Sequence, residues 1–176
     1  MAPSFVHSPE SLMRRTLLAL ALALPLAATA CLGEDPIAPA LPVDQVEFAP
    51  ALGVDLAAST ELPSGLWFRD ITEGTSTQPA VADTVYVSYD GRLTNGTRFD
   101  QGKFGFRLGR NETIAGFDQG VSTMKVGGRR QLIIPPHLGY GPQWVMTNTK
   151  VEIPPNSWLV FDVTVDSIKV ATPATE

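Results

Sequence analysis

The stretch VYVSYDGRLTNGTRFD, residues 85–100, decides the fold because it encodes two strands joined by a tight turn. Apolar and more polar side chains alternate over residues 85–89, which is the period-two pattern of a strand with one buried face. Asn95-Gly96 tolerates the positive φ angles that a tight reversal of the chain requires. We therefore predict a strand over residues 84–93 and a returning strand that starts at Phe99-Asp100.

Other segments add strands and one helix to this hairpin. Strand-like runs occur at residues 66–73, 104–108, 129–134 and 159–166. The last run is the clearest, because every second side chain from Leu159 to Val165 is apolar. One segment has helical spacing and ends at Gly127-Gly128, with apolar residues at Ile114, Phe117, Val121 and Met124. The sequence thus predicts an α+β fold of about five strands around one short helix, which covers the apolar face of the sheet.

The composition narrows the classes of function. Of the 176 residues 44% are hydrophobic, and 13 Lys and Arg stand against 18 Asp and Glu, giving a net charge of −5. This acidic balance argues against nucleic acid as a partner, because proteins that bind it usually carry a basic face. The single cysteine excludes an intrachain disulfide and a Cys-cluster zinc site, and two distant histidines argue against an imidazole metal site. We expect no metal and no cofactor, and nothing in the sequence requires more than a monomer.

Residues 1–30 have the pattern of a secretory signal peptide. Arg14-Arg15 precede an apolar run, and small residues at 27–30 lead directly to Cys31. The run from Leu17 to Ala30 is 14 residues long, which is shorter than the ~20 residues that a membrane-spanning helix needs. The segment therefore predicts export of the chain and not a transmembrane anchor.

Small residues directly before Cys31 resemble the lipobox of bacterial lipoproteins, in which the cysteine is acylated and begins the mature protein. The resemblance implies a lipid anchor on Cys31 and a location outside the cytoplasm, on the periplasmic side of a bacterial membrane or at the cell surface. The alternative is an ordinary signal peptidase site beside an incidental cysteine. The position of the start codon is open as well. Met13, next to the arginine pair, fits an initiator better than Met1, and if translation begins at Met13, residues 1–12 are not translated.

The distribution of charge divides the mature chain into two parts. All the surplus negative charge lies between Glu34 and Glu61, whereas residues 64–176 carry 11 acidic and 11 basic side chains. Five prolines fall within 31–63, a composition typical of an extended tether. We predict a tether over 31–63, a folded domain over 64–170 and a tail over 171–176. Six apolar side chains give the tether surfaces that can dock on the domain: Val43, Val46, Phe48, Leu52, Val54 and Leu56.

Four ordered blocks resemble the FKBP-type peptidyl-prolyl cis-trans isomerases. They are VYVSYDGRLTNGTRFD (85–100), FGFRLGRNETIAGFDQGVSTMKVGGRR (104–130), IPPHLGYG (134–141) and IPPNSWLVFDVTV (153–165). The resemblance covers residues 64–170 and implies the fold of the family, a twisted antiparallel sheet of five or six strands wrapped around one short helix. It also implies isomerase activity on proline-containing polypeptides, without a cofactor.

The resemblance implies in addition which residues form the site. Those expected to act in catalysis are Tyr89, Phe99, Asp100, Tyr140 and Phe161. Those expected to bind substrate are Phe104, Glu112, Thr113, Ile114, Phe117 and Ile153. In the family the amide at the position of Ile114 and the hydroxyl at that of Tyr140 bond to the substrate, and Tyr89 holds Asp100. For the aromatic residues taken alone, plain core packing is the alternative.

Three departures from the family pattern bear on function. Phe117 stands where Trp is usual at the floor of the pocket. The connection between Asp100 and Phe104 is only three residues long, and a later segment is longer, with Trp144 and Met146 expected at the substrate entrance. We predict an isomerase that assists the folding of exported proteins. Two alternatives stay open: a module that holds a proline segment without useful turnover, and a scaffold lipoprotein with no proline function.

Overall fold

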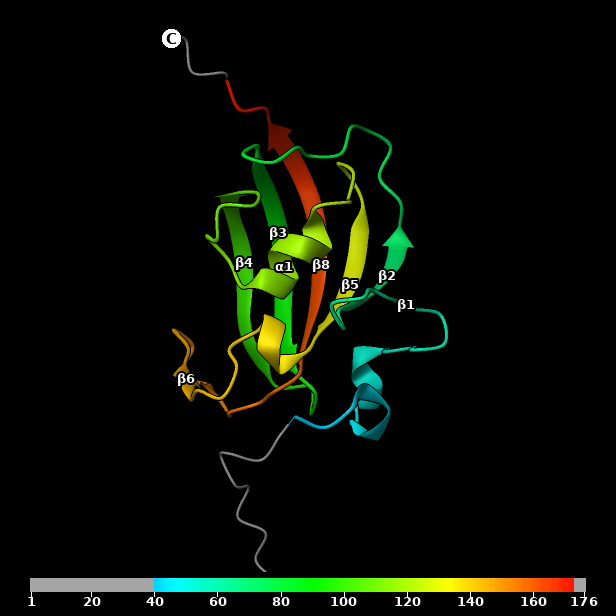
Figure 1. Cartoon of the computed structure of the whole chain (residues 1–176), viewed down its shortest axis with the longest axis vertical. Coiled ribbons are helices and arrows are strands. Elements are labelled where there is room, and N and C mark those ends of the chain that lie inside the picture. Colours follow the sequence, from blue (N-terminus) through cyan, green and yellow to red (C-terminus); the bar gives the residue numbers. More distant parts are fainter. Residues whose placement is uncertain (1–39, 173–176) are drawn as a thin grey trace, which may run out of the picture. The chain divides into compact units, whose positions relative to one another are not determined.

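The computed structural model describes residues 40–172, in which a six-stranded antiparallel sheet has the strand order β1-β2-β5-β8-β3-β4 (Figure 1). The elements in chain order, with η for a 3-10 helix, are η1 (Val43–Gln45), η2 (Pro50–Leu52), β1 (Thr60–Glu61), β2 (Trp67–Thr72), β3 (Thr84–Leu93), β4 (Arg98–Arg107), α1 (Ala115–Val121), β5 (Arg129–Ile134), η3 (Pro136–Leu138), β6 (Val145–Met146), β7 (Glu152–Ile153) and β8 (Leu159–Lys169). Strands β6 and β7 form a separate two-stranded hairpin. The predicted α+β fold, with five to six antiparallel strands around one short helix, is confirmed.

The β3–β4 hairpin forms where the sequence of residues 85–100 predicts it. The Leu93 amide donates to the Thr97 carbonyl at 2.9 Å, and Gly96 takes a φ of +88° in the turn. Strand β4 differs from the prediction because it is one continuous strand and not two short ones separated by residues 101–103. These three residues pair with β3 at Asp90, Tyr89 and Ser88. Backbone pairing across the hairpin therefore carries the strand through a polar segment that lacks apolar alternation.

Helix α1 is shorter than its apolar spacing predicts. It ends at Val121, six residues before Gly127-Gly128. Met124 lies beyond the helix, in a turn where its amide donates to the Val121 carbonyl at 2.9 Å, yet its side chain is buried in the core. Spacing alone could not separate a helical residue from one that a following turn returns to the same core.

Figure 1 shows α1 in front of the sheet, and two glycines let the helix lie close to β5. A Cβ atom on Gly116 would come within 2.4 Å of Ile134 Cγ2, and one on Gly120 within 2.5 Å of Leu132 Cδ2. Side chains at these two helix positions would clash with β5, so glycine permits the contact. The helix therefore covers one face of the sheet, and the main hydrophobic core lies between them.

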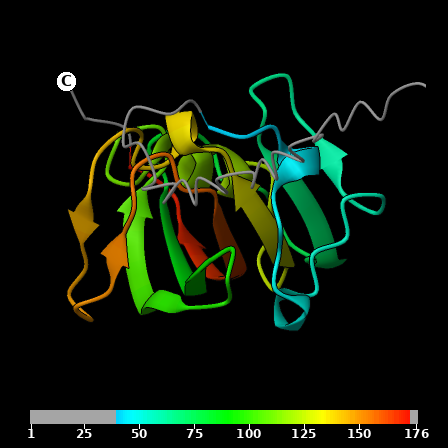
Figure 2. The same cartoon turned by 90° about the horizontal axis from the view of Figure 1, so that it is seen from below.

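Residues 40–57, here called the strap, lie against the sheet and are not detached from it. The Gln131 side chain donates from Nε2 to the Leu52 carbonyl at 2.8 Å, and the Trp158 indole donates to the Leu41 carbonyl at 2.9 Å. Leu52 is buried, so one of the six apolar residues of the predicted tether docks on the domain. Figure 2 shows the strap in cyan beside the strands.

The face that the strap covers follows from strand geometry. Leu132 points toward α1, so its neighbours Gln131 and Ile133 on β5 point to the opposite face. Both are buried there, although α1 is on the other side. Leu52 thus caps the far face of the sheet. No helix in residues 40–172 combines the length and apolarity needed to cross a bilayer.

Candidate functional site

Aromatic rings from four elements meet on the α1 side of the sheet. The ring centroid of Tyr89 on β3 lies 5.2 Å from that of Phe104 on β4 and 6.2 Å from that of Phe117 on α1. The ring of Phe161 on β8 lies 5.4 Å from both Phe117 and Phe99. Most of these pairs meet edge to face, a favourable geometry for rings. We call these five residues the ring cluster.

The ring cluster has a buried floor and an accessible side. Phe99, Phe117 and Phe161 are buried, whereas Tyr89 and Phe104 are only partly buried. A sixth ring, which the sequence analysis did not include, extends the floor. Phe106 is buried, and its centroid lies 5.5 Å from Phe104 and 5.8 Å from Phe117. The sequence could have identified Phe106 by its position two residues after Phe104, which places both side chains on the same face of β4.

A carboxylate lies beside the ring cluster in a fixed orientation. The Tyr89 hydroxyl donates to Asp100 Oδ2 at 2.8 Å, and the Gln101 amide donates to Asp100 Oδ1 at 2.9 Å. Burial, followed by the hydrogen bond to Asp100, raises the pKa of Tyr89 to about 12. Tyr89 is therefore a neutral donor at physiological pH. Its bond aims one carboxylate oxygen while the side chain of Asp100 stays only half-buried.

Tyr140 stands close to the same carboxylate. Its side chain is partly buried and packs against the core, and burial followed by the negative charge of Asp100 raises the pKa of Tyr140. The Tyr140 hydroxyl donates to no residue among those that the structure describes. It is therefore a neutral hydroxyl that remains available to a bound molecule.

Gly91 creates the space in which two of the rings meet. A Cβ atom on Gly91 would lie 2.7 Å from Phe161 Cε1 and 2.9 Å from Phe99 Cζ. Real Cβ atoms do not approach other atoms so closely, so any side chain at this position would push the rings apart. Gly102 on β4 differs, because its Cβ would lie 3.7 Å from the Tyr89 hydroxyl, at ordinary contact distance.

The other predicted substrate-binding residues lie around the ring cluster in different settings. Ile153 is fully buried in the core, and Ile114 is the N-cap of α1 and partly buried. Thr113 precedes it, with its hydroxyl 3.4 Å from the Ile114 carbonyl. Glu112 faces Arg107 instead, at 2.6 Å from Oε1 to Nε. These residues frame one end of the cluster at the start of α1.

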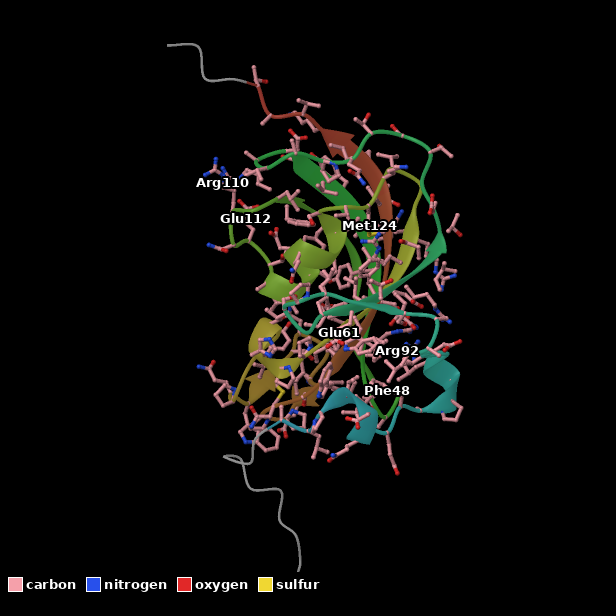
Figure 3. The ribbon with its side chains drawn as sticks, turned by 45° about the vertical axis from the view of Figure 1, so that its right-hand side comes forward. Phe48, Glu61, Arg92, Arg110, Glu112 and Met124 are labelled. Carbon is pink, nitrogen blue, oxygen red and sulfur yellow. The ribbon has the colours of Figure 1, made fainter. Side chains whose placement is uncertain are left out.

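Glu112 organises the β4–α1 loop. Its Oε2 also accepts the Arg107 amide at 2.8 Å, and this backbone bond, followed by the bond from the guanidinium, holds the pKa of Glu112 below its usual range. Figure 3 shows Glu112 and Arg110 on this loop, far from Phe48 and Arg92. Both carboxylate oxygens of Glu112 are thus engaged within its own loop, which the sequence could not indicate.

Residues 75–166, just over half of the chain, match the family of FKBP-type peptidyl-prolyl cis-trans isomerases. The chain belongs to this family.

Relatives and solved structures of the FKBP type agree with the match. The chain is 46% identical over 105 residues to FK506-binding protein 4 of Dictyostelium discoideum, covering 58% of this chain and 28% of the relative. It is 44% identical over 115 residues to FK506-binding protein 4 of Mycosarcoma maydis, covering 63% of this chain and 29% of that protein. The chain thus matches less than a third of the length of these eukaryotic relatives.

The chain matches larger shares of solved FKBP-type structures than of these relatives. The crystal structure of FkpA from Escherichia coli matches with a TM-score of 0.56 and 36% identity, covering 65% of this chain and 53% of that one. The crystal structure of AtFKBP13 matches with a TM-score of 0.57 and 34% identity, covering 62% of this chain and 97% of that one. These matches support the antiparallel sheet and single helix described above.

The FKBP-type domain carries a hairpin, β6–β7, with two exposed apolar side chains. Trp144 and Met146 are 60% and 61% exposed, whereas Val145 and Val151 pack against the core. We predicted Trp144 and Met146 at the substrate entrance. They are accessible to a bound polypeptide, as that prediction requires.

Two cavities among the described residues lie away from the ring cluster. One of about 740 Å³ is bordered by the strap and by Trp67, Pro135 and Trp158, and one of about 250 Å³ lies beside Arg130. Within residues 40–172 no group of three or more His, Cys, Asp or Glu side chains could hold a metal ion. Cys31, the predicted site of lipidation, lies outside the described residues.

Proposed function

We propose that this FKBP-type chain accelerates cis-trans isomerisation of X-Pro bonds at the ring cluster. The observation that carries the proposal is the 2.8 Å hydrogen bond from Tyr89 to Asp100, which orients a carboxylate beside partly exposed aromatic rings. The apolar rings suit a proline ring, and the polar groups at their margin suit the flanking amides. The expected substrates are proline-containing polypeptides.

The chemistry asks for a surface that favours a twisted amide. Resonance gives X-Pro rotation a barrier of about 18–20 kcal/mol, and uncatalysed exchange takes tens of seconds or longer. The twisted transition state has lost this resonance, so its carbonyl is less polar. It therefore loses less hydration free energy when it leaves water. A site of aromatic rings therefore binds the twisted form better than the planar one. A thousandfold acceleration requires about 4 kcal/mol of such preference.

The polar groups have separate roles in this proposal. Asp100, held by Tyr89 and by the Gln101 amide, supplies an oriented charge near the rotating amide and transfers no proton, because isomerisation moves none. The Tyr140 hydroxyl and the Ile114 amide anchor substrate carbonyls. Neither group donates to an acceptor within residues 40–172, so both are available.

A protease-coupled assay on Leu-Pro and Phe-Pro peptides tests the proposal. We expect the full chain to accelerate isomerisation, and Tyr89→Phe and Asp100→Ala to reduce kcat/KM. Asp166→Ala is the matched control, because this carboxylate binds Ser88 and Lys103 on the far face of the sheet. Parent and site variants that all fail to accelerate the reaction would contradict an isomerase.

A binding module is the second candidate, and the observation that favours it is Phe117 at the floor of the ring cluster. A phenyl ring offers less stacking surface to proline than an indole does. If proline peptides shift the NMR resonances of the ring cluster without acceleration of isomerisation, the chain binds proline segments and does not turn them over. If they cause neither effect, the chain has no proline function.

We propose further that the chain is a lipoprotein anchored through Cys31 outside the cytoplasm, where it assists the folding of exported proteins. Prolyl isomerisation can limit the folding rate of such clients. Support comes from the signal-like segment over 1–30 and the small residues before Cys31. The FK506-binding relatives are eukaryotic and bear only on the isomerase domain. Cys31→Ser should move the protein from the membrane to the soluble fraction; unchanged membrane association would contradict a lipid anchor.

A further inference from the structure

One hydroxyl connects the β6–β7 hairpin to the strand that carries Asp100. Thr149, in the hairpin turn, donates from Oγ1 to the Phe99 carbonyl at 2.6 Å, fifty residues away in the chain. Its oxygen also lies 2.8 Å from the Thr147 hydroxyl. Thr147 in turn bonds to both the amide and the carbonyl of Val151. The turn is therefore held together internally and fastened externally at one carbonyl.

The Phe99 carbonyl is available because of its place in the sheet. β4 is the last strand of the sheet, so every second residue turns its backbone groups outward, away from β3. The pairing of β3 with β4 also shifts register between Gly91 and Arg92, opposite Asp100 and Arg98. Phe99 lies between these two partners. Thr149 thus fills a hydrogen-bonding position at an irregular point of the edge, next to the oriented carboxylate.

Besides the packing of Val145, Val151 and Ile153 against the core, the hairpin itself contributes little to holding its position. Its strands are two residues each, and a two-stranded hairpin of this size is at best marginally stable alone. Val145 pairs with Ile153, which is buried in the core beside the ring cluster. The neighbours of Val145, Trp144 and Met146, project into solvent. A change in the attachment would therefore move these exposed side chains relative to the ring cluster.

We propose that Thr149 is a positioning residue, whose hydroxyl fastens the β6–β7 hairpin to Phe99 and so holds Trp144 and Met146 where a bound polypeptide meets them. This inference rests on the proposed isomerase function. Loss of the hydroxyl leaves the competent position of the hairpin only partly populated, so that the apparent affinity for substrate falls by that fraction. The chemistry at Asp100 is unchanged once the peptide is bound. The effect thus falls on KM and not on kcat.

The experiment compares three variants of the full chain on a Phe-Pro peptide. Thr149→Val keeps the shape and removes the hydroxyl, Thr149→Ser keeps the hydroxyl, and Thr97→Val is the control, an exposed threonine in the β3–β4 turn. We expect Thr149→Val to raise KM about two- to tenfold with kcat unchanged, the range that one net hydrogen bond implies. Thr149→Ser and Thr97→Val should stay within about twofold of the parent.

Hydrogen exchange of the hairpin amides supplies a readout that is independent of activity. The Thr147 and Lys150 amides bond within the hairpin, to the carbonyls of Val151 and Thr147, and should exchange faster in Thr149→Val only. An unchanged KM in Thr149→Val, a fall in kcat alone, or a serine variant that fails to restore KM would overturn the inference. If the parent has no isomerase activity, the proposed function fails, and exchange alone then decides: equal rates in all variants would refute the attachment.

Discussion

Arg130 and Asp100 both point toward the α1 side of the sheet, one from β5 and the other from β4 at the edge, but their surroundings differ. The Arg130 guanidinium donates to both carboxylate oxygens of Asp70, at 2.7 and 2.9 Å, and to the Gly120 carbonyl of α1 at 2.8 Å. It also donates to the Thr123 hydroxyl and lies 4.2 Å from the centre of the Phe68 ring. Its side chain is only 6% exposed.

Asp100 is held in a fixed orientation, but protein groups do not enclose it as they enclose Arg130. It accepts two hydrogen bonds, from Tyr89 and from the Gln101 amide, and it remains half-buried near Tyr140, whose hydroxyl donates to no residue within 40–172. The difference separates the two roles. A buried charge whose partners are all supplied by the protein stabilises the fold, whereas a charge that is aimed and left partly accessible can act on a bound molecule.

The largest effect should come from removing Arg130, the buried charge of this comparison. We expect Arg130→Met to lower the free energy of unfolding by about 3 kcal/mol, because removal of the guanidinium leaves the partly buried Asp70 carboxylate and the Gly120 carbonyl without this donor. The control is Arg129→Met, which removes an exposed pair with Asp162 and should cost less than about 1 kcal/mol. Urea denaturation measures both. Equal losses in the two variants would mean that burial of Arg130 contributes nothing.

A smaller effect should follow from filling the space beneath the rings. Gly91→Ala forces Phe99 and Phe161 apart, and such overpacking costs about 1–3 kcal/mol. Activity should fall about tenfold or more, because the ring cluster is displaced. Gly102→Ala adds the same methyl group where there is room and should change the unfolding free energy by less than about 0.5 kcal/mol. The comparison between the Arg130 and Asp100 regions fails if Gly91→Ala leaves both stability and kcat/KM intact.

The smallest effect concerns the pH dependence of the stability that Tyr89 contributes beside Asp100. The folded pKa of Tyr89, about 12, exceeds its ordinary value of 10.0, mainly because of burial and then the bond to Asp100. Stability from this group is therefore present below pH 10 and is lost as the pH rises toward 12. The unfolding free energy of the parent should fall more steeply over this interval than that of Tyr89→Phe. Parallel curves for the two proteins in urea denaturation would show that the hydroxyl is not held as described.

The sequence predicted the strands best where a local pattern decides the structure. Residues 84–93 and 129–134 become β3 and β5 with the predicted bounds, and β8 begins at Leu159. For β3 and β8, alternation of apolar and polar side chains over several residues indicates a strand. The ring cluster also gathers five of the aromatic residues that the family resemblance predicts, among them Tyr89 and Phe161. Their catalytic roles stay predictions that the proposed assay addresses.

What the sequence could not predict depends on distant partners. The role of Glu112 at the substrate stays a prediction, but its pairing with Arg107 could not be foreseen, because nothing local selects that partner. Leu52 was identified as able to dock, but the site of docking depends on Gln131, which is far away in the chain. Thr149 carries no motif at all. Hydrogen bonds between segments far apart in sequence determine these features, and periodicity contains no information about them.

The docked strap also sets how far the isomerase domain could travel from a membrane. If Cys31 carries the proposed lipid, only eight residues lie between it and Ala40, where the strap begins, and a fully extended chain over that interval reaches about 30 Å. An undocked tether up to Ser64 would reach about 110 Å. With such a lipid, the docked strap would confine the domain to a thin layer next to the bilayer, which would raise its effective concentration for polypeptides that emerge there.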